Sequence, residues 1–153
     1  PARGNEVSES SDLYMRVTYM DAEGNAIDPT RLEQGTQFYA SVTLRHPGVK
    51  GRYENLALAQ VFPSGWEINN LRLTDDEQQD ESRQFTYQDI RDDRVYTYFD
   101  LNRNQEKIFR VSLTATYAGD YYLPAVSCET MYDPGVYARV KGQTVSVVKA
   151  VRQ

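Results

Sequence analysis

Apolar and polar residues alternate along much of the chain, which is the pattern of β-strands that bury one face. The clearest case is the segment 38–44, where every second residue from Phe38 to Leu44 is apolar and the residues between them are Tyr, Ser and Thr. The segments 13–19 and 108–117 alternate in the same way. The nearly continuous apolar run 56–61 is typical of a central, buried strand.

Turn-forming residues separate these segments. They are Asp21-Ala-Glu-Gly-Asn25, Asp28-Pro29, His46-Pro47-Gly48, Pro63-Ser64-Gly65, Gly119-Asp120 and Tyr132-Asp133-Pro134-Gly135. Further strands are predicted at 85–90, 95–101, 121–131 and 145–148, and a short edge segment contains Trp66, Ile68, Leu71 and Leu73. The strands 85–90 and 95–101 form a hairpin around Arg91, Asp92, Asp93 and Arg94. About eight or nine strands without a helical period predict an all-β, antiparallel sandwich.

One domain accounts for the length of the chain, 153 residues. Residues 1–12 are polar and rich in Ser and Glu, and they predict a linker or a disordered arm. Residues 13–149 form the predicted sandwich, and residues 150–153 form a C-terminal tail.

The formal net charge of −5, with dispersed Lys and Arg, argues against nucleic acid as a partner. No stretch of about 18 apolar residues is present, so direct membrane insertion is not expected. The single cysteine, Cys128, excludes a disulfide within the chain.

The candidates for acid/base chemistry are four carboxylates, Asp89, Asp92, Asp93 and Asp100, but catalysis is not expected. Asp at a hairpin tip usually bonds to its own backbone. The segment 21–25 and the acidic loop 75–81 offer oxygen ligands, but neither follows the spacing of a calcium loop, so no metal site is predicted. No cofactor is expected either.

Cys128 lacks a nearby histidine in the sequence, and the pattern places it with Val126 and Thr130 on one strand face. We interpret it as a small buried apolar residue rather than a nucleophile. The only histidine, His46, is predicted to be a surface turn residue.

Tyrosine is abundant, and several tyrosines lie in predicted strands: Tyr14, Tyr39, Tyr87, Tyr96, Tyr98, Tyr121 and Tyr122. Cross-strand packing is the expected role for most of them. An exposed row of tyrosines would instead suggest a free-standing adhesion or carbohydrate-binding module of the cell envelope, which is the alternative function.

Three stretches resemble the last domain of bacterial alpha-2-macroglobulins. They are Ala59-Gln-Val-Phe-Pro-Ser-Gly-Trp-Glu-Ile-Asn69, Asp89-Ile-Arg-Asp-Asp-Arg-Val95, and Gly119-Asp-Tyr-Tyr-Leu-Pro-Ala-Val-Ser-Cys-Glu-Thr-Met-Tyr-Asp-Pro134 with Ala138-Arg139 and Gly142 after it. The third stretch is the most specific. The first part of the chain fits the family only in its strand pattern and in Gly35 before a strand.

The resemblance implies an immunoglobulin-like sandwich in a protease inhibitor of the periplasm or cell envelope, with a possible lipoprotein anchor on the parent protein. In this family a protease cleaves a bait region, the molecule rearranges, and a thioester in another domain captures the protease. The thioester motif is Cys-x-Glu-Gln, whereas Cys128 is followed by Glu129 and Thr130, so this domain cannot form the thioester. Its implied role is to pack beside the thioester domain, shield the thioester and respond to bait cleavage. Its implied partners are neighbouring domains, and proteases through the whole parent.

The loop Met131-Tyr132-Asp133-Pro134 is our predicted inter-domain contact. Met adapts to irregular surfaces, and Tyr combines a large apolar face with one polar group. Pro134 and Gly135 restrict the turn that carries them. The competing interpretation places Tyr132 against the end of its own domain as a corner residue.

Overall fold

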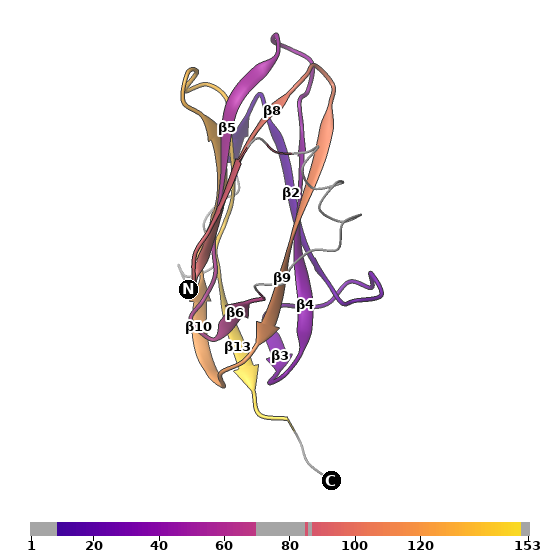
Figure 1. The fold of residues 1–153 in the computed structure, drawn as a ribbon, viewed down its shortest axis with the longest axis vertical. Coiled ribbons are helices and arrows are strands. Elements are labelled where there is room, and N and C mark those ends of the chain that lie inside the picture. The colour runs from indigo at the N-terminus through magenta and orange to yellow at the C-terminus, as the bar shows by residue number, and fades with distance from the viewer. Residues whose placement is uncertain (1–8, 70–84, 86, 151–153) are drawn as a thin grey trace.

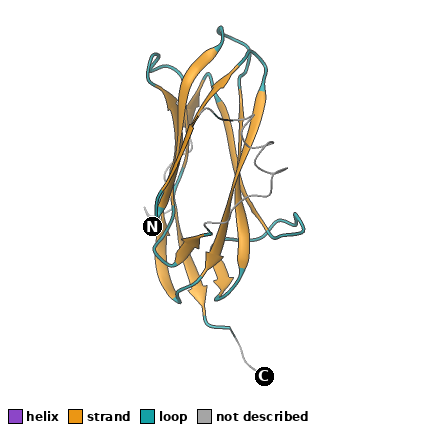
Figure 2. Cartoon of the chain, viewed as in Figure 1, coloured by secondary structure: helices purple, strands orange, loops and turns teal. Residues whose placement is uncertain are grey.

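Two layers of strands face each other in the computed structural model, which describes residues 9–69, 85 and 87–150 (Figures 1 and 2). The described residues contain no helix, so none that could cross a membrane, and the predicted all-β class is confirmed. The strands are β1 (Glu9–Ser11), β2 (Tyr14–Met20), β3 (Arg31–Glu33), β4 (Gln37–Arg45), β5 (Tyr53–Val61), β6 (Trp66–Ile68), β7 (Tyr87–Ile90), β8 (Arg94–Leu101), β9 (Glu106–Ala115), β10 (Gly119–Leu123), β11 (Val126–Thr130), β12 (Tyr137–Val140) and β13 (Gln143–Val148).

Three sheets build the sandwich. One layer is a six-stranded sheet with the order β1-β12-β11-β5-β8-β7. It faces a four-stranded sheet with the order β2-β4-β9-β6, of which β2, β4 and β9 stand on the right in Figure 1. A three-stranded sheet, β10-β13-β3, lies at the lower end in this view. The pairing of β13 with β3 is parallel, and every other pairing between named strands is antiparallel.

The alternating residues predicted to face inward form the core. Phe38, Ala40, Val42 and Leu44 are at most 1% exposed. The inward residues of β9 meet them across the register of β4 and β9, where Val42 is opposite Phe109. Two adjoining clusters result, one around Leu56, Leu58, Phe99 and Phe109 and one around Phe38, Trp66, Leu113 and Val145.

The structure differs from the sequence prediction in four elements. Glu9–Ser11, inside the predicted linker, pairs with β12 as strand β1. The predicted strand 121–131 is divided, because β10 ends at Leu123 and β11 begins at Val126. β3 and β12 were not predicted, since they are only three and four residues long. Leu71 and Leu73 of the predicted edge segment lie outside the described residues.

Candidate contact site at one end of the sandwich

Three loops leave the sandwich at the same end. They are the β4–β5 loop (46–52), the β8–β9 loop (102–105) and the β11–β12 loop (131–136). Their common position follows from the strand registers, which pair Arg45 with Glu106, Tyr53 with Leu101, and Leu56 with Thr130. This end is at the top of Figure 1, opposite the sheet formed by β10, β13 and β3.

The β11–β12 loop is a tight turn with its own hydrogen bonds. The amide of Gly135 donates to the Asp133 carboxylate at 2.9 Å, and the amide of Val136 donates to the Asp133 carbonyl at 2.9 Å. At the start of the loop, the Thr130 hydroxyl donates to the carbonyl of Glu54 at 2.9 Å, which attaches the loop to β5.

Met131 and Tyr132 project from this turn into solvent. Met131 is 77% exposed and Tyr132 is 74% exposed, more than any other large apolar side chains of the described residues. The Tyr132 hydroxyl accepts a hydrogen bond from the side chain of Asn55 at 3.3 Å. The interpretation of Tyr132 as a corner residue packed on its own domain is therefore not supported by its exposure.

The same turn is connected to the β4–β5 loop by an ion pair. The Lys50 ammonium lies 2.9 Å from the Asp133 carboxylate and 3.2 Å from that of Asp12. These contacts raise the pKa of Lys50, with Asp133 as the leading cause. The hydrogen bonds from Lys50 and from the Gly135 amide lower the pKa of Asp133.

The prediction that His46 is a surface turn residue was wrong. His46 is 0% exposed, and its ring stacks on Tyr53 with centroids 3.8 Å apart. Its Nδ1 accepts from the Gly48 amide at 2.9 Å, and its Nε2 lies 2.6 Å from the Gly51 carbonyl oxygen. A carbonyl only accepts, so Nε2 donates, which is the bonding of a neutral imidazole. The signal in the sequence was the strand alternation, since His46 occupies the next inward position after Leu44.

The carboxylates considered for catalysis do not form one cluster. Asp93 pairs with Arg94 at 2.9 Å and Asp89 with Arg91 at 3.1 Å, both at the predicted hairpin, where Asp92 is exposed. The side-chain hydrogen bond from Arg94 lowers the pKa of Asp93.

Asp100 lies at the other end of β8 and pairs with Arg52 at 3.0 Å. An acid and a base for one reaction must both reach one substrate. Asp100 is separated from the hairpin carboxylates by the length of β8, and Asp89, Asp93 and Asp100 each pair with a nearby arginine.

The described residues contain no group of three or more His, Cys, Asp or Glu side chains able to hold a metal ion. In the segment 21–25, the Asp21 carboxylate accepts the amides of Glu23 and Asn25 at 3.0 and 2.9 Å, which is a turn cap. The acidic loop 75–81 lies outside the described residues.

Cys128 is 1% exposed, which confirms its interpretation as a buried residue. It lies opposite Leu58 of β5 and Ala138 of β12. Burial raises the pKa of its thiol. Because the thiolate is the reactive form, this environment does not suit a nucleophile.

The strand tyrosines do not make one row. Tyr14 and Tyr39 belong to the four-stranded sheet, and Tyr121 and Tyr122 belong to β10. Tyr87 and Tyr98 stack across β7 and β8 with centroids 5.8 Å apart, and Tyr96 is the next outward residue on β8. This is the cross-strand packing expected from the sequence.

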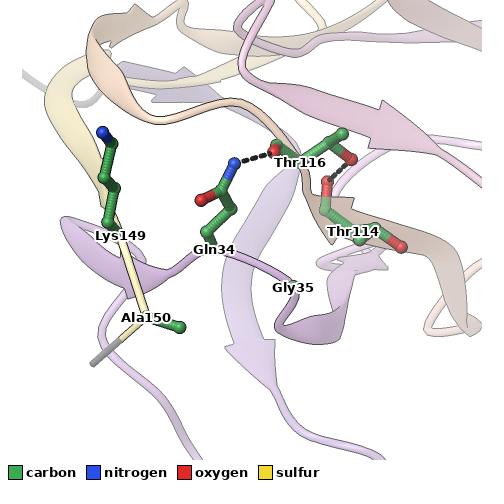
Figure 3. Close-up of a pocket in the computed structure, with 6 residues that line it drawn as sticks. All are labelled: Gln34, Gly35, Thr114, Thr116, Lys149 and Ala150. Atoms are coloured by element: carbon green, nitrogen blue, oxygen red, sulfur yellow. Dashed lines mark hydrogen bonds between the residues drawn. The ribbon is translucent and has the colours of Figure 1, made fainter. Parts of the chain in front are cut away.

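A pocket of about 510 Å³ lies at the opposite end of the sandwich, where it is lined by Gln34, Gly35, Thr114, Thr116, Lys149 and Ala150 (Figure 3). The Gln34 amide donates to the Thr116 carbonyl at 2.9 Å. In Figure 3 the Gln34 side chain points toward Thr116, so its donor is used within the fold.

Comparison with known proteins agrees with this architecture. The family of the bacterial alpha-2-macroglobulin MG10 domain matches residues 13–135. The chain is 24% identical to an alpha-2-macroglobulin of Pasteurella multocida over 145 residues, which are 94% of this chain and 7% of that protein. The chain thus spans a small part of its longer relative.

Solved structures of the same kind share the fold. Salmonella alpha-2-macroglobulin reacted with methylamine superposes with a TM-score of 0.80 and 19% identity, over 94% of this chain and 10% of that one. Native Escherichia coli alpha-2-macroglobulin from domain MG7 to the C-terminus superposes with a TM-score of 0.78 and 17% identity, over 94% of this chain and 24% of that one. With the family match over most of the sandwich, this chain belongs to the bacterial alpha-2-macroglobulin MG10 domain family.

Proposed function

We propose that this chain is a non-catalytic packing domain of a bacterial alpha-2-macroglobulin-like protease inhibitor. It contacts a neighbouring thioester domain through the contact loop Met131-Tyr132-Asp133-Pro134, keeps water from the thioester, and moves when the bait region is cleaved. The parent protein resides in the periplasm or cell envelope. The observation that carries the proposal is the exposure of Met131 (77%) and Tyr132 (74%) on a turn that is held by its own hydrogen bonds.

Rigid presentation of apolar side chains favours association. Two large apolar groups in water gain free energy when another surface covers them. The hydrogen bonds of Asp133 and Thr130 hold the backbone before any partner arrives, so little conformational entropy is left to lose on binding. Val49, 64% exposed in the neighbouring β4–β5 loop, adds apolar area at the same end.

A hydrophobic cover is also what a thioester requires. Thioesters hydrolyse, so the group must be kept from water until a protease arrives. Tyr132 has the size and the single polar group that suit a cover at a domain boundary. This chain supplies the cover and not the thioester, because Cys128-Glu129-Thr130 lacks the required motif.

The test is Tyr132→Ala, first in this 153-residue chain and then in the full-length parent. In the chain, the melting temperature should hardly change, because an exposed side chain contributes within about 0.5 kcal/mol. In the parent, the thioester should hydrolyse faster before any protease is added. Release of the thioester thiol, followed with a thiol reagent, measures this rate.

A matched control is Tyr87→Ala, which removes another exposed tyrosine, 59% exposed, from the edge strand β7. It should leave thioester hydrolysis in the parent unchanged. If Tyr132→Ala instead destabilises the isolated chain by roughly 3 kcal/mol, the loss typical of a buried aromatic, Tyr132 is core and the contact proposal is wrong.

A further inference from the structure

One ammonium group joins three segments at the contact end of the sandwich. Lys50, in the β4–β5 loop, lies between Asp133 of the contact loop and Asp12, which directly follows β1. All three side chains are partly exposed, at 39% for Lys50, 44% for Asp133 and 36% for Asp12. The ion triplet therefore connects the beginning of the folded domain to the contact loop.

Lys50 allows two like charges to lie close together. The two carboxylate oxygens that contact its nitrogen are no more than about 6 Å apart, which is the sum of their distances of 3.2 and 2.9 Å. Carboxylates this close repel each other unless a cation lies between them. Removing the ammonium would push Asp133 away from Asp12, and Asp133 is the residue that caps the turn.

Both carboxylates belong to residues that the backbone already holds. The carbonyl of Asp12 accepts the Tyr53 hydroxyl at 2.6 Å, and Asp12 has a φ of 55°, in the left-handed region. Asp133 bonds to the amides of Gly135 and Val136. Because only the lysine is a long free side chain, forming the triplet costs less side-chain entropy than an ordinary surface pair of two flexible chains.

We propose that Lys50 is a positioning residue of the contact loop. It holds Asp133, and with it the direction of Met131 and Tyr132, in a fixed relation to the start of the sandwich at Asp12. This rests on the proposed function, because positioning matters only if the loop makes a contact. The contact itself is assigned to Met131 and Tyr132, and Lys50 acts through Asp133.

Amide hydrogen exchange in the 153-residue chain tests the proposal. Lys50→Met keeps most of the side-chain length and removes the charge, Lys50→Arg keeps the charge, and Lys141→Met removes an exposed charge from another turn. In Lys50→Met the amides of Gly135 and Val136 should exchange at least about fivefold faster. In Lys50→Arg and Lys141→Met they should stay within about twofold of the wild type.

A spectroscopic readout separates positioning from general stability. The carboxyl carbon of Asp133, followed by NMR, should titrate at higher pH in Lys50→Met than in the wild type or in Lys50→Arg. Melting temperatures should differ little, since partly exposed ion pairs contribute little to stability. Raising the salt concentration should speed exchange of the loop amides in the wild type, where it screens the ion pairs, and should slow it in Lys50→Met, where it screens the repulsion between the two carboxylates.

Failure of this proposal is distinguishable from failure of the proposed function. If Lys50→Met leaves both the amide exchange and the Asp133 titration unchanged, Lys50 does not position the loop, whatever Tyr132→Ala does in the parent. If Lys50→Met frees the loop but Tyr132→Ala leaves thioester hydrolysis unchanged, the positioning is real and the contact assignment is wrong.

Discussion

Buried polar side chains show how individual residues are accommodated in this domain. His46 has a hydrogen-bond partner for each ring nitrogen and a stacking partner in Tyr53. Gln60 differs: it is 1% exposed, and its amide nitrogen and oxygen make no hydrogen bond within the described part of the chain. A buried amide without partners loses the free energy of its hydration.

Replacing Gln60 with Met should therefore stabilise the domain. Met has nearly the same length and shape and no polar group to desolvate, so the free energy of unfolding should rise by about 1–3 kcal/mol. Urea unfolding followed by circular dichroism measures the change.

Thr97→Val is the matched control for this substitution. Thr97 is 0% exposed and lies near Gln60 on the adjacent strand β8, but its hydroxyl accepts the Gln88 amide at 3.0 Å. Removing that hydroxyl breaks a satisfied hydrogen bond and should lower stability by about 1 kcal/mol. A destabilised Gln60→Met would show that the amide is satisfied in solution.

The alternation in the sequence predicted most of the positions that face the core. It did not predict that two of these positions hold buried polar side chains. Every second residue from Phe38 to Leu44 and from Phe109 to Ala115 faces the core as expected. His46 and Gln60 also occupy inward positions. His46 was predicted at the surface, and Gln60 is the polar residue within the run 56–61 that was predicted to be a buried strand. Their burial depends on loop folding and on packing from other strands, which period alone does not contain.

Aspartates cap several turns that join the strands. Asp21 accepts backbone amides before β3, and Asp28 accepts the amide and hydroxyl of Thr30 at 3.0 and 2.6 Å. These hydrogen bonds lower the pKa of both carboxyls, with the Asn25 amide as the leading cause for Asp21 and the Thr30 hydroxyl for Asp28. The hydrogen bonds of these two turns therefore stabilise the ionised form of each aspartate side chain.

Stability should consequently fall in acid. A carboxyl whose pKa is lower in the folded state stabilises the fold above its usual pKa of 3.8, and this contribution is lost as the pH falls through the folded-state value. Urea unfolding from about pH 6 to about pH 3 should show the loss.

The double variant Asp21→Asn, Asp28→Asn tests which groups cause this loss. Asn keeps a carbonyl acceptor for the turn but does not titrate. As the pH is lowered, the stability of the double variant should therefore decline less steeply than that of the wild type. Equal slopes for the two proteins would assign the acid sensitivity to other groups.

Strand prediction succeeded for the long strands and for the short strands β6 and β7, and it failed for the short strands β1, β3 and β12. β4 and β9 contain enough alternating residues for a clear pattern. β1 and β3 have three residues each, and their pairing depends on backbone hydrogen bonds to β12 and β13. The Lys50–Asp133 contact could not be predicted from the sequence either. It joins two loop residues that are 83 positions apart, and loops have no alternation of apolar and polar residues to indicate which of them meet.

At the scale of the whole molecule, the last strands complete both core clusters. Ala138 of β12 belongs to one cluster, and Val145 and Val147 of β13 belong to the other. The family match ends at residue 135, before either strand begins. The sandwich in this chain therefore depends on residues beyond the matched region.

A chain that ends at residue 135 should not fold cooperatively. It would expose the edge of β11 that pairs with β12, and it would leave both β10 and β3 without their partner β13. Thermal unfolding followed by near-ultraviolet circular dichroism should show no sharp transition. A chain ending at residue 150 is the control, and it should melt as the full chain does. A sharp transition in the shorter chain would show that β12 and β13 are dispensable.

The parallel pairing of β3 with β13 also governs when the domain is finished during synthesis. Leu32 and Val147 are partners, although on the order of a hundred residues separate them. Closing a loop of that length costs about 4 kcal/mol of chain entropy before the contact forms. Because synthesis proceeds from the N-terminus, almost the entire domain must be synthesised before β3 can pair with β13. Until then the unpaired strand edges remain open to chaperones and to other chains.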